Sequence, residues 1–149
     1  MKTALAALAI LILEGAPAWA TLGEYESSVS VDQRVLRGAD REEAREGYKI
    51  HQLTAPDGTV VKELISPAGL VFEVTWQSER MPNLQQLLGS SMAELQVALQ
   101  SSTHRRRGGP LIVQTNTLVF VSGGHMRSFH GYAYVPGLVP RGVSPRVAQ

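Results

Sequence analysis

The segment that brings the most chemically capable residues together is Ser122–Arg127, which reads SGGHMR. Two glycines let a backbone turn tightly or approach a ligand closely, so Gly123 and Gly124 are candidate binding residues. His125 can act as an acid, a base or a metal ligand near neutral pH. The Arg127 guanidinium can hold a carboxylate or phosphate through two parallel hydrogen bonds. The alternative interpretation is a Gly-Gly hairpin turn with exposed polar flanks.

A hydrolase centre is a second interpretation of the same segment. Ser122 and His125 would supply the nucleophile and base, and an aspartate from the first half of the chain, Asp32 or Asp57, would have to orient the histidine. The sequence has no Gly-x-Ser-x-Gly elbow, and no carboxylate follows Glu94. We therefore predict no catalytic residue.

A metal site is the third interpretation. Imidazole and thioether groups at His125, Met126 and His130 suit copper, and His51 and His104 would add ligands if the fold brought them close. A separation of five residues, however, places His125 and His130 on opposite faces of a single strand. Spacing alone selects no metal geometry, so we predict no metal ligand and no cofactor.

A basic run, Arg105, Arg106 and Arg107, is the other candidate binding surface. It can bind a polyanion such as acidic lipid headgroups or a polysaccharide, or it can pair with the acidic segment 40–46. Residues 95–149 carry 6 Arg and no acid, whereas residues 21–94 carry 7 basic and 12 acidic residues. The net charge of the whole chain is only +1, which argues against a general nucleic-acid binder.

The N-terminus has the pattern of a secretory signal peptide. Lys2 precedes an apolar run over residues 4–13, and Ala18–Ala20 (AWA) matches the cleavage pattern. Ten apolar residues form about 15 Å of helix, which is too short for a bilayer core of roughly 30 Å. We therefore predict cleavage near Ala20 and a periplasmic or secreted chain without a membrane anchor.

The remaining 21–149 segment has the length of one domain. The chain of 149 residues is 44% hydrophobic and 18% charged, which is typical of a folded globule. It has no Cys, so a hydrophobic core rather than disulfides must stabilise it.

The elements that must position these residues begin with an antiparallel meander. Strands are predicted over 48–54, 59–65 and 70–76, separated by the turn sequences APDG and SPAG. In the third strand, Phe72, Val74 and Trp76 are expected to share one face, because side chains alternate with a period of two.

Residues 82–101 predict the main helix. Its apolar side chains form one stripe that we expect in the core: Leu84, Leu87, Leu88, Met92, Leu95 and Leu99. Asn83 with Gln86 forms a possible capping box. The helix is either continuous or broken near Gly89, since Ser91 with Glu94 can cap a second segment.

Shorter elements flank this pattern. Residues 29–36 predict a short helix capped by Ser30 or Asp32, and the charged residues 40–46 favour another helix. A hairpin is predicted over 110–122 and a last strand over 128–135. The predicted fold class is α+β, an antiparallel meander sheet with one main amphipathic helix packed on a face.

Several short motifs follow one another along the chain. They are ATLG at the end of the signal peptide, PDG, SPAG with VF, WQ, MPNL, QLLGS, and SGGHMR followed by Tyr134 and Pro136. In this order they resemble a proteobacterial family of small exported proteins known only as a domain of unknown function. The resemblance covers nearly the whole mature chain. It implies an envelope or secreted protein and carries no activity, catalytic residue or cofactor.

The function that these observations predict is a non-catalytic binding or interaction module whose partner is another envelope protein. The sequence lacks a convergent catalytic set, and the predicted sheet has open edges that can take up a partner strand. The alternative is a small periplasmic hydrolase or metal-binding protein centred on SGGHMR. No oligomeric state is predicted.

Overall fold

The computed structural model describes residues 22–101 and 109–145. These residues form a seven-stranded antiparallel sheet in the order β1-β2-β3-β4-β7-β6-β5. Its strands are β1 (Ala39–Arg45), β2 (Tyr48–Thr54), β3 (Val60–Ile65), β4 (Val71–Ser78), β5 (Leu111–Gln114), β6 (Val119–His125) and β7 (Ser128–Tyr134). The helices are η1 (Glu26–Ser28), α1 (Val29–Leu36), α2 (Leu84–Leu88), α3 (Ser91–Ser101) and η2 (Pro136–Leu138).

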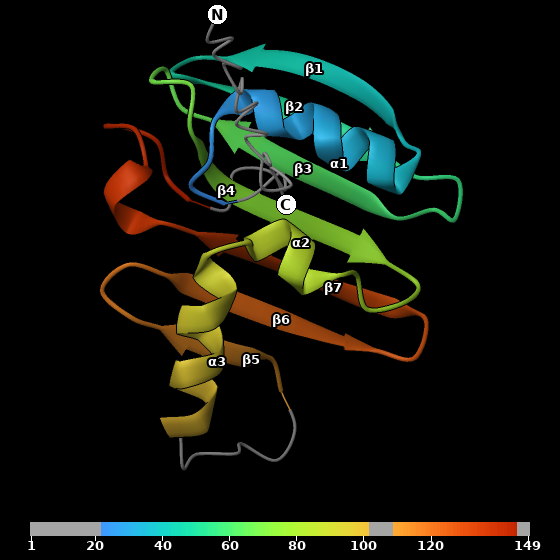
Figure 1. The fold of residues 1–149 in the computed structure, drawn as a ribbon, viewed down its shortest axis with the longest axis vertical. Helices are drawn as coiled ribbons and strands as arrows, with labels where there is room; N and C mark the ends of the chain where they lie inside the picture. Colours follow the sequence, from blue (N-terminus) through green and yellow to red (C-terminus); the bar gives the residue numbers. More distant parts are fainter. Residues whose placement is uncertain (1–21, 102–108, 146–149) are drawn as a thin grey trace, which may run out of the picture.

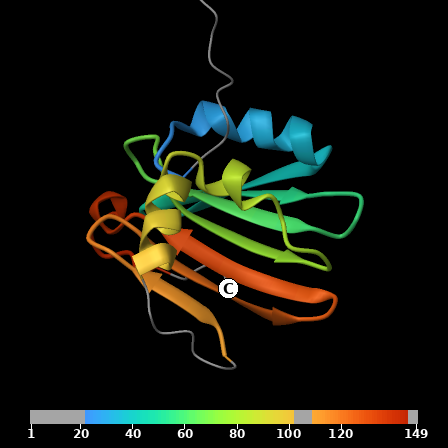
Figure 2. The ribbon, with the colours of Figure 1, turned by 60° about the horizontal axis from the view of Figure 1, so that its bottom comes forward.

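All three α-helices cover the same face of the sheet (Figure 1, Figure 2). The predicted α+β class is therefore confirmed, as are the antiparallel sheet and the helix on its face. None of the described helices is long and apolar enough to cross a membrane. The predicted signal peptide and the Arg105–Arg107 run lie outside the described residues.

Two meanders make up the sheet. Strands β1 to β4 follow one another along the chain, and β5 to β7 form the second set. The pairing of β4 with β7 joins them, with Val74 opposite Ala133 and Trp76 opposite Gly131. The Trp76 ring lies against Gly131, where an added Cβ would collide with it. It also stacks on Phe120, with ring centroids 5.7 Å apart.

The predicted strands β2, β3 and β4 and their turns are confirmed. Gly58 and Gly69 adopt positive φ angles of 84° and 77°, which glycine tolerates without steric cost. The Asp57 carboxylate accepts a hydrogen bond from the Thr59 amide at 2.9 Å and so fixes the first turn. The Gly69 amide donates to the Ser66 carbonyl at 2.8 Å in the second.

The prediction of a helix over residues 40–46 is wrong. Residues Ala39–Arg45 form β1, which pairs with β2 along its whole length from Ala39 opposite Thr54 to Arg45 opposite Tyr48. Every residue of β1 is exposed. An edge strand accommodates charged side chains on both faces, so pairing with β2 overrides the helix propensity of the segment.

The expectation that Phe72 shares a face with Val74 and Trp76 is also wrong. The register shifts between Leu64 and Ile65, so that Leu64 lies opposite Glu73 and Ile65 opposite Val71. Phe72 is the extra residue of this irregularity, which interrupts the period of two. It packs with Ile50 and Leu64 in a second, smaller core on the face opposite the helices.

The helical segment over residues 84–101 breaks at Gly89, whose φ of 46° and ψ of −118° lie outside the helical range. The Asn83 side chain accepts the Gln86 amide hydrogen bond, as the capping box predicts. Most of the apolar stripe packs in or against the core, with Leu87, Leu88 and Leu95 fully buried. Leu99, near the end of α3, is 38% exposed, contrary to the expectation that it is core.

Candidate functional site

The segment Ser122–Arg127 forms most of one arm and the turn of the β6–β7 hairpin. His125 lies opposite Ser128, so the turn consists of Met126 and Arg127. Arg127 has a positive φ of 65°. The two glycines therefore lie within strand β6 and not in the turn.

The backbone geometry of the hairpin requires glycine at one of these two positions, Gly124. Gly124 has a φ of 140°, and an added Cβ would run into the Ser128 carbonyl of the neighbouring strand. Gly123 lies opposite His130 and has ordinary room around it.

The proposed hydrolase residues are not brought together. Ser122 is buried, whereas the His125 ring is exposed and its Nδ1 lies 3.3 Å from the carbonyl of Met126. Asp32 lies on the buried side of α1, where its carboxylate accepts a hydrogen bond from Gln86 and contacts no residue of the hairpin.

The histidines are also arranged differently from the sequence expectation. His125 and His130 do not share a strand, because the turn separates them onto β6 and β7. His51 lies on β2, which is separated from β7 by β3 and β4. His51 therefore lies in a different part of the sheet from His125 and His130. His104 lies outside the described residues.

Gly123 is the predicted binding residue that lines a groove of about 420 Å³. Lys62, Thr75 and Tyr132 also line it and alternate along their strands with core residues, so the groove lies on the face opposite the helices. The full lining is Val60, Lys62, Thr75, Trp76, Gln77, Pro110, Val121, Gly123, His130, Gly131 and Tyr132.

The two edge strands of the sheet differ strongly in character. Five of the seven residues of β1 are charged, and all seven are exposed. Strand β5, with the sequence LIVQ, carries no charge. Leu111 and Ile112 are 45% and 57% exposed, and we call these two residues of β5 the β5 edge surface.

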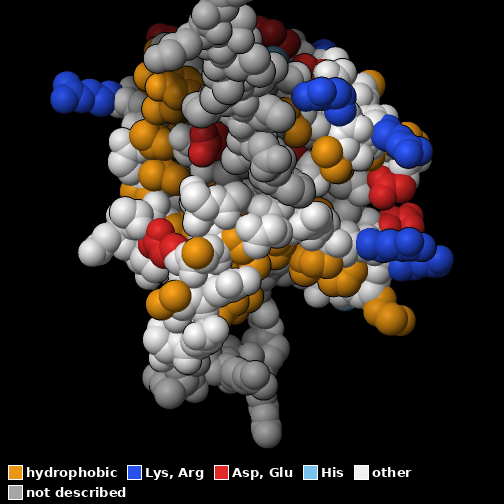
Figure 3. Space-filling model, viewed as in Figure 1, with side chains coloured by type: hydrophobic (Ala, Val, Ile, Leu, Met, Phe, Trp, Pro, Cys, Tyr) orange, Lys and Arg blue, Asp and Glu red, His pale blue; other side chains and the backbone are white. Residues whose placement is uncertain are grey.

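The surface that residues 22–101 and 109–145 form around β5 is equally poor in charge. In Figure 3 the described surface over the lower half of α3 and over β5 shows apolar and uncharged side chains without Lys, Arg, Asp or Glu. Val97 and Leu99 of α3 are 67% and 38% exposed. Helix α3 packs against β5, so these exposed apolar side chains belong to neighbouring elements.

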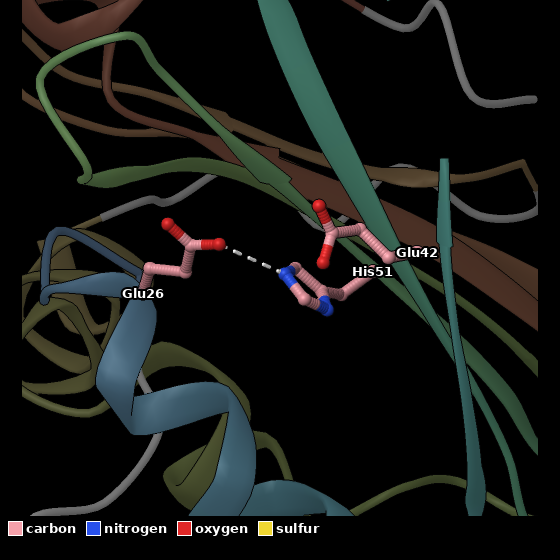
Figure 4. Close-up of side chains that lie close together, drawn as sticks. All are labelled: Glu26, Glu42 and His51. Carbon is pink, nitrogen blue, oxygen red and sulfur yellow. Dashed lines mark hydrogen bonds and ion pairs between the residues drawn. The ribbon is translucent and has the colours of Figure 1, made fainter. Parts of the chain in front are cut away.

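A polar cluster that sequence reasoning missed lies at the other side of the sheet. It consists of Glu26 from η1, Asp40 and Glu42 from β1, and Lys49 and His51 from β2, and we call it the histidine–carboxylate cluster. His51 is only 7% exposed. Its Nδ1 lies 3.0 Å from Asp40 Oδ2. Its Nε2 lies 3.2 Å from Glu26 Oε1, and Glu42 lies beside this pair (Figure 4).

Lys49 neutralises part of this negative charge. Its Nζ lies 2.7 Å from Glu26 Oε1 and 3.8 Å from Glu42 Oε1. The hydrogen bond from Lys49 lowers the pKa of Glu26, and the same bond raises the pKa of Lys49. The cluster was missed because residues 40–46 were expected to be helical. The available signal was the alternation of Asp40 with Glu42, and of Lys49 with His51, across a turn at Gly47.

A buried pair of carboxyl groups adjoins the cluster. Glu63 lies opposite His51 in the β2–β3 pairing, and both Glu63 and Asp32 are 1% exposed. Gln86 Nε2 donates to Asp32 Oδ1 at 2.5 Å. Burial raises the pKa of Glu63 to about 9 and that of Asp32 to about 6.

Glu63 therefore holds a proton at neutral pH. No hydrogen-bond donor among the described residues reaches either Glu63 oxygen. Two ionised carboxylates would both be acceptors, but the protonated Glu63 can donate to Asp32. Burial and the neighbouring Asp32 carboxyl group of α1 thus both favour the protonated form of Glu63.

Comparison with known protein families gives a match over most of the chain. Residues 18–148 match the family described as "Protein of unknown function (DUF2844)". No curated protein and no solved structure matches the chain. Because the matched residues include nearly the whole chain, the protein belongs to this family of unknown function.

Proposed function

We propose that the protein is an exported, non-catalytic interaction module that binds an extended segment of another envelope protein along strand β5. Residues 1–20 act in this proposal as a signal peptide that is removed near Ala20, and residues 21–149 form a single domain. The observation that carries the proposal is the contrast between the charged β1 edge and the uncharged, apolar β5 edge.

Edge strands expose unpaired backbone groups that pair readily with another strand. Proteins protect such edges with charged side chains, as β1 does with five charged residues in seven. Strand β5 itself carries no charged side chain and, in the described part of the chain, exposes Leu111 and Ile112. An incoming strand would form backbone hydrogen bonds with β5 and cover these apolar side chains.

The charge of the surrounding chain favours an acidic partner over a second copy. Residues 95–149 contain 6 Arg and no acidic residue. Two copies meeting at β5 would bring like charges together, whereas a partner segment with Asp or Glu would meet opposite charge. Arg105, Arg106 and Arg107 are proposed contacts for those acidic residues.

The predicted binding residues of the β6–β7 hairpin lie close to the same sheet edge. Leu111 lies opposite Ser122, so β5 does not extend alongside the last three residues of β6. Gly123, Gly124 and His125 therefore have a strand partner on one side only within the described residues. A partner segment that continues past the start of β5 and bends inward by one strand spacing, about 4.8 Å, would reach them, with Arg127 at the turn as a further contact for a carboxylate.

Site-specific photo-crosslinking in intact cells tests the proposal. A photoreactive residue replaces Ile112 in one variant and Val35 of α1 in the control, since the two side chains are 57% and 54% exposed. We expect position 112, and not position 35, to capture one reproducible envelope protein through a segment that contains acidic residues. Replacement of Arg105, Arg106 and Arg107 by Glu should abolish the capture.

Two results would overturn the proposal. One is equal capture at positions 112 and 35. The other is no capture at position 112 under conditions in which a known envelope pair crosslinks. Mapping the crosslink onto a second copy of this chain would replace the acidic partner with self-association.

A further inference from the structure

We propose that Glu26, Glu42 and His51 form a binding site for a single divalent metal ion of the zinc class. Each residue offers one ligand atom, and the three atoms lie within 4.8 Å of one another. His51 Nε2 and Glu26 Oε1 are 3.2 Å apart. Two ligands about 2.1 Å from one zinc ion at the tetrahedral angle would lie roughly 3.4 Å apart, which this pair nearly meets.

The imidazole is already oriented for such a role. The His51 side chain is only 9% exposed, and Asp40 accepts a hydrogen bond from Nδ1 at 3.0 Å. A carboxylate on one ring nitrogen fixes the ring and leaves the other nitrogen to face the ligand, as metal-binding histidines commonly require. Asp40 is therefore a positioning residue, and Nε2 is directed at Glu26.

Lys49 competes with the ion for the same oxygens. Its ammonium lies on Glu26 Oε1 at 2.7 Å and near Glu42 Oε1 at 3.8 Å. The Lys49 side chain is 44% exposed, so it can turn into solvent when a divalent ion takes its place. The site should consequently bind more tightly once the lysine charge is removed, which a merely structural ion pair would not do.

The donor set selects the chemical class of the ion. One imidazole nitrogen with two carboxylate oxygens suits zinc and its neighbours in the first transition row, whereas calcium and magnesium prefer oxygen ligands alone. The three ligands come from η1, β1 and β2, so binding would tie the segment before α1 to the edge of the sheet. The site lies at the β1 side of the sheet, remote from β5, and does not depend on the proposed partner surface.

Calorimetric titration of the untagged, chelator-treated protein with Zn²⁺ tests this inference. We expect one ion per chain. Binding should weaken at least tenfold in Glu42→Gln and in His51→Gln, remain unchanged in the control His125→Ala, and tighten in Lys49→Met. Glu42 lies on an exposed edge strand with a side chain 54% exposed, so its variant tests the site even if His51→Gln fails to fold.

A second measurement separates specific binding from surface binding. Zn²⁺ should raise the melting temperature of the native chain and of His125→Ala, but not of Glu42→Gln. The inference is overturned if no saturable binding occurs, or if Glu42→Gln and His51→Gln bind as the native chain does. Weaker binding in Lys49→Met would equally contradict it.

Discussion

At the scale of single residues, Glu63 makes the stability of the fold depend on pH. Its pKa is raised from 4.5 to about 9 by burial and by the neighbouring Asp32. The folded chain keeps a proton that the unfolded chain releases above pH 4.5. The resulting stability is fully present below pH 4.5 and is lost as the pH rises towards 9.

The window above pH 6 isolates this residue, because the pKa of Asp32 is raised only to about 6. Between pH 6.5 and 8.5 we expect the free energy of unfolding to fall by on the order of 2.5 kcal/mol, because the slope is about 1.4 kcal/mol per pH unit and flattens slightly as the pH nears 9. Glu63→Gln should remove most of this slope, since an amide donates to Asp32 without titrating. Urea denaturation at several pH values measures it.

The exposed residue Glu79 provides the control. Glu79→Gln should keep the slope of the native chain. The same slope in Glu63→Gln would show that the buried pair does not hold the proton.

Sequence reasoning reached only part of these residue-level sites. It named His51 as a possible metal ligand but linked it to His125 and His130, which lie across the sheet. Asp40 and Glu42 meet His51 only because β1 pairs with β2 in one register. The partners of a side chain across strands depend on that register, which residue types alone do not determine.

At the scale of elements, Gly89 decides whether α2 and α3 are one helix or two. In a continuous helix, Gly89→Ala would stabilise the fold by about 1 kcal/mol, since alanine has the higher helix propensity. At the observed φ of 46° and ψ of −118°, a Cβ is strained, and strain of this kind costs on the order of 1–3 kcal/mol. We therefore expect Gly89→Ala to lower the free energy of unfolding, measured by urea denaturation.

The sign of the change in the free energy of unfolding distinguishes one continuous helix from two helices separated at Gly89. Gly137→Ala is the matched control, because an added Cβ there has no atom within 4 Å. A stabilising effect of Gly89→Ala would mean that the helix is continuous through this position.

The elements that were predicted correctly are those with a strong local signal. Strands β2 to β4 are bounded by Pro-Asp-Gly and Pro-Ala-Gly turns, and these turns recur in the structure. Strand β1 has no apolar alternation, since its sequence ADREEAR faces solvent throughout. Its conformation comes from the neighbouring strand, so local propensity pointed to a helix instead.

At the scale of the whole molecule, a single sheet from two meanders was predictable, but its order was not. The junction depends on the pairing of β4 with β7, which lie far apart along the chain. Both strands carry apolar residues on the helix side, so their periodicity is compatible with several orders. The helices between them fill the face that this junction creates (Figure 2).

The C-terminal segment covers the face of the sheet opposite the α-helices. Leu138, Val139 and Val143 pack against the second core around Phe72. The Val135 amide donates to the Phe72 carbonyl at 3.0 Å, which guides the segment onto β4. We expect truncation after Val135 to lower the free energy of unfolding by on the order of 2–4 kcal/mol, because three apolar side chains no longer cover this core.

Truncation after Pro145 is the matched control, since it leaves the covering residues in place and should keep native stability. Urea denaturation gives the free energies, and binding of a hydrophobic dye should increase only in the shorter chain as Phe72 becomes exposed. If the shorter chain does not fold, Leu138→Ala should show a smaller loss of the same sign. Equal stability of the two truncated chains would mean that the sheet face opposite the α-helices does not need this segment as a cover.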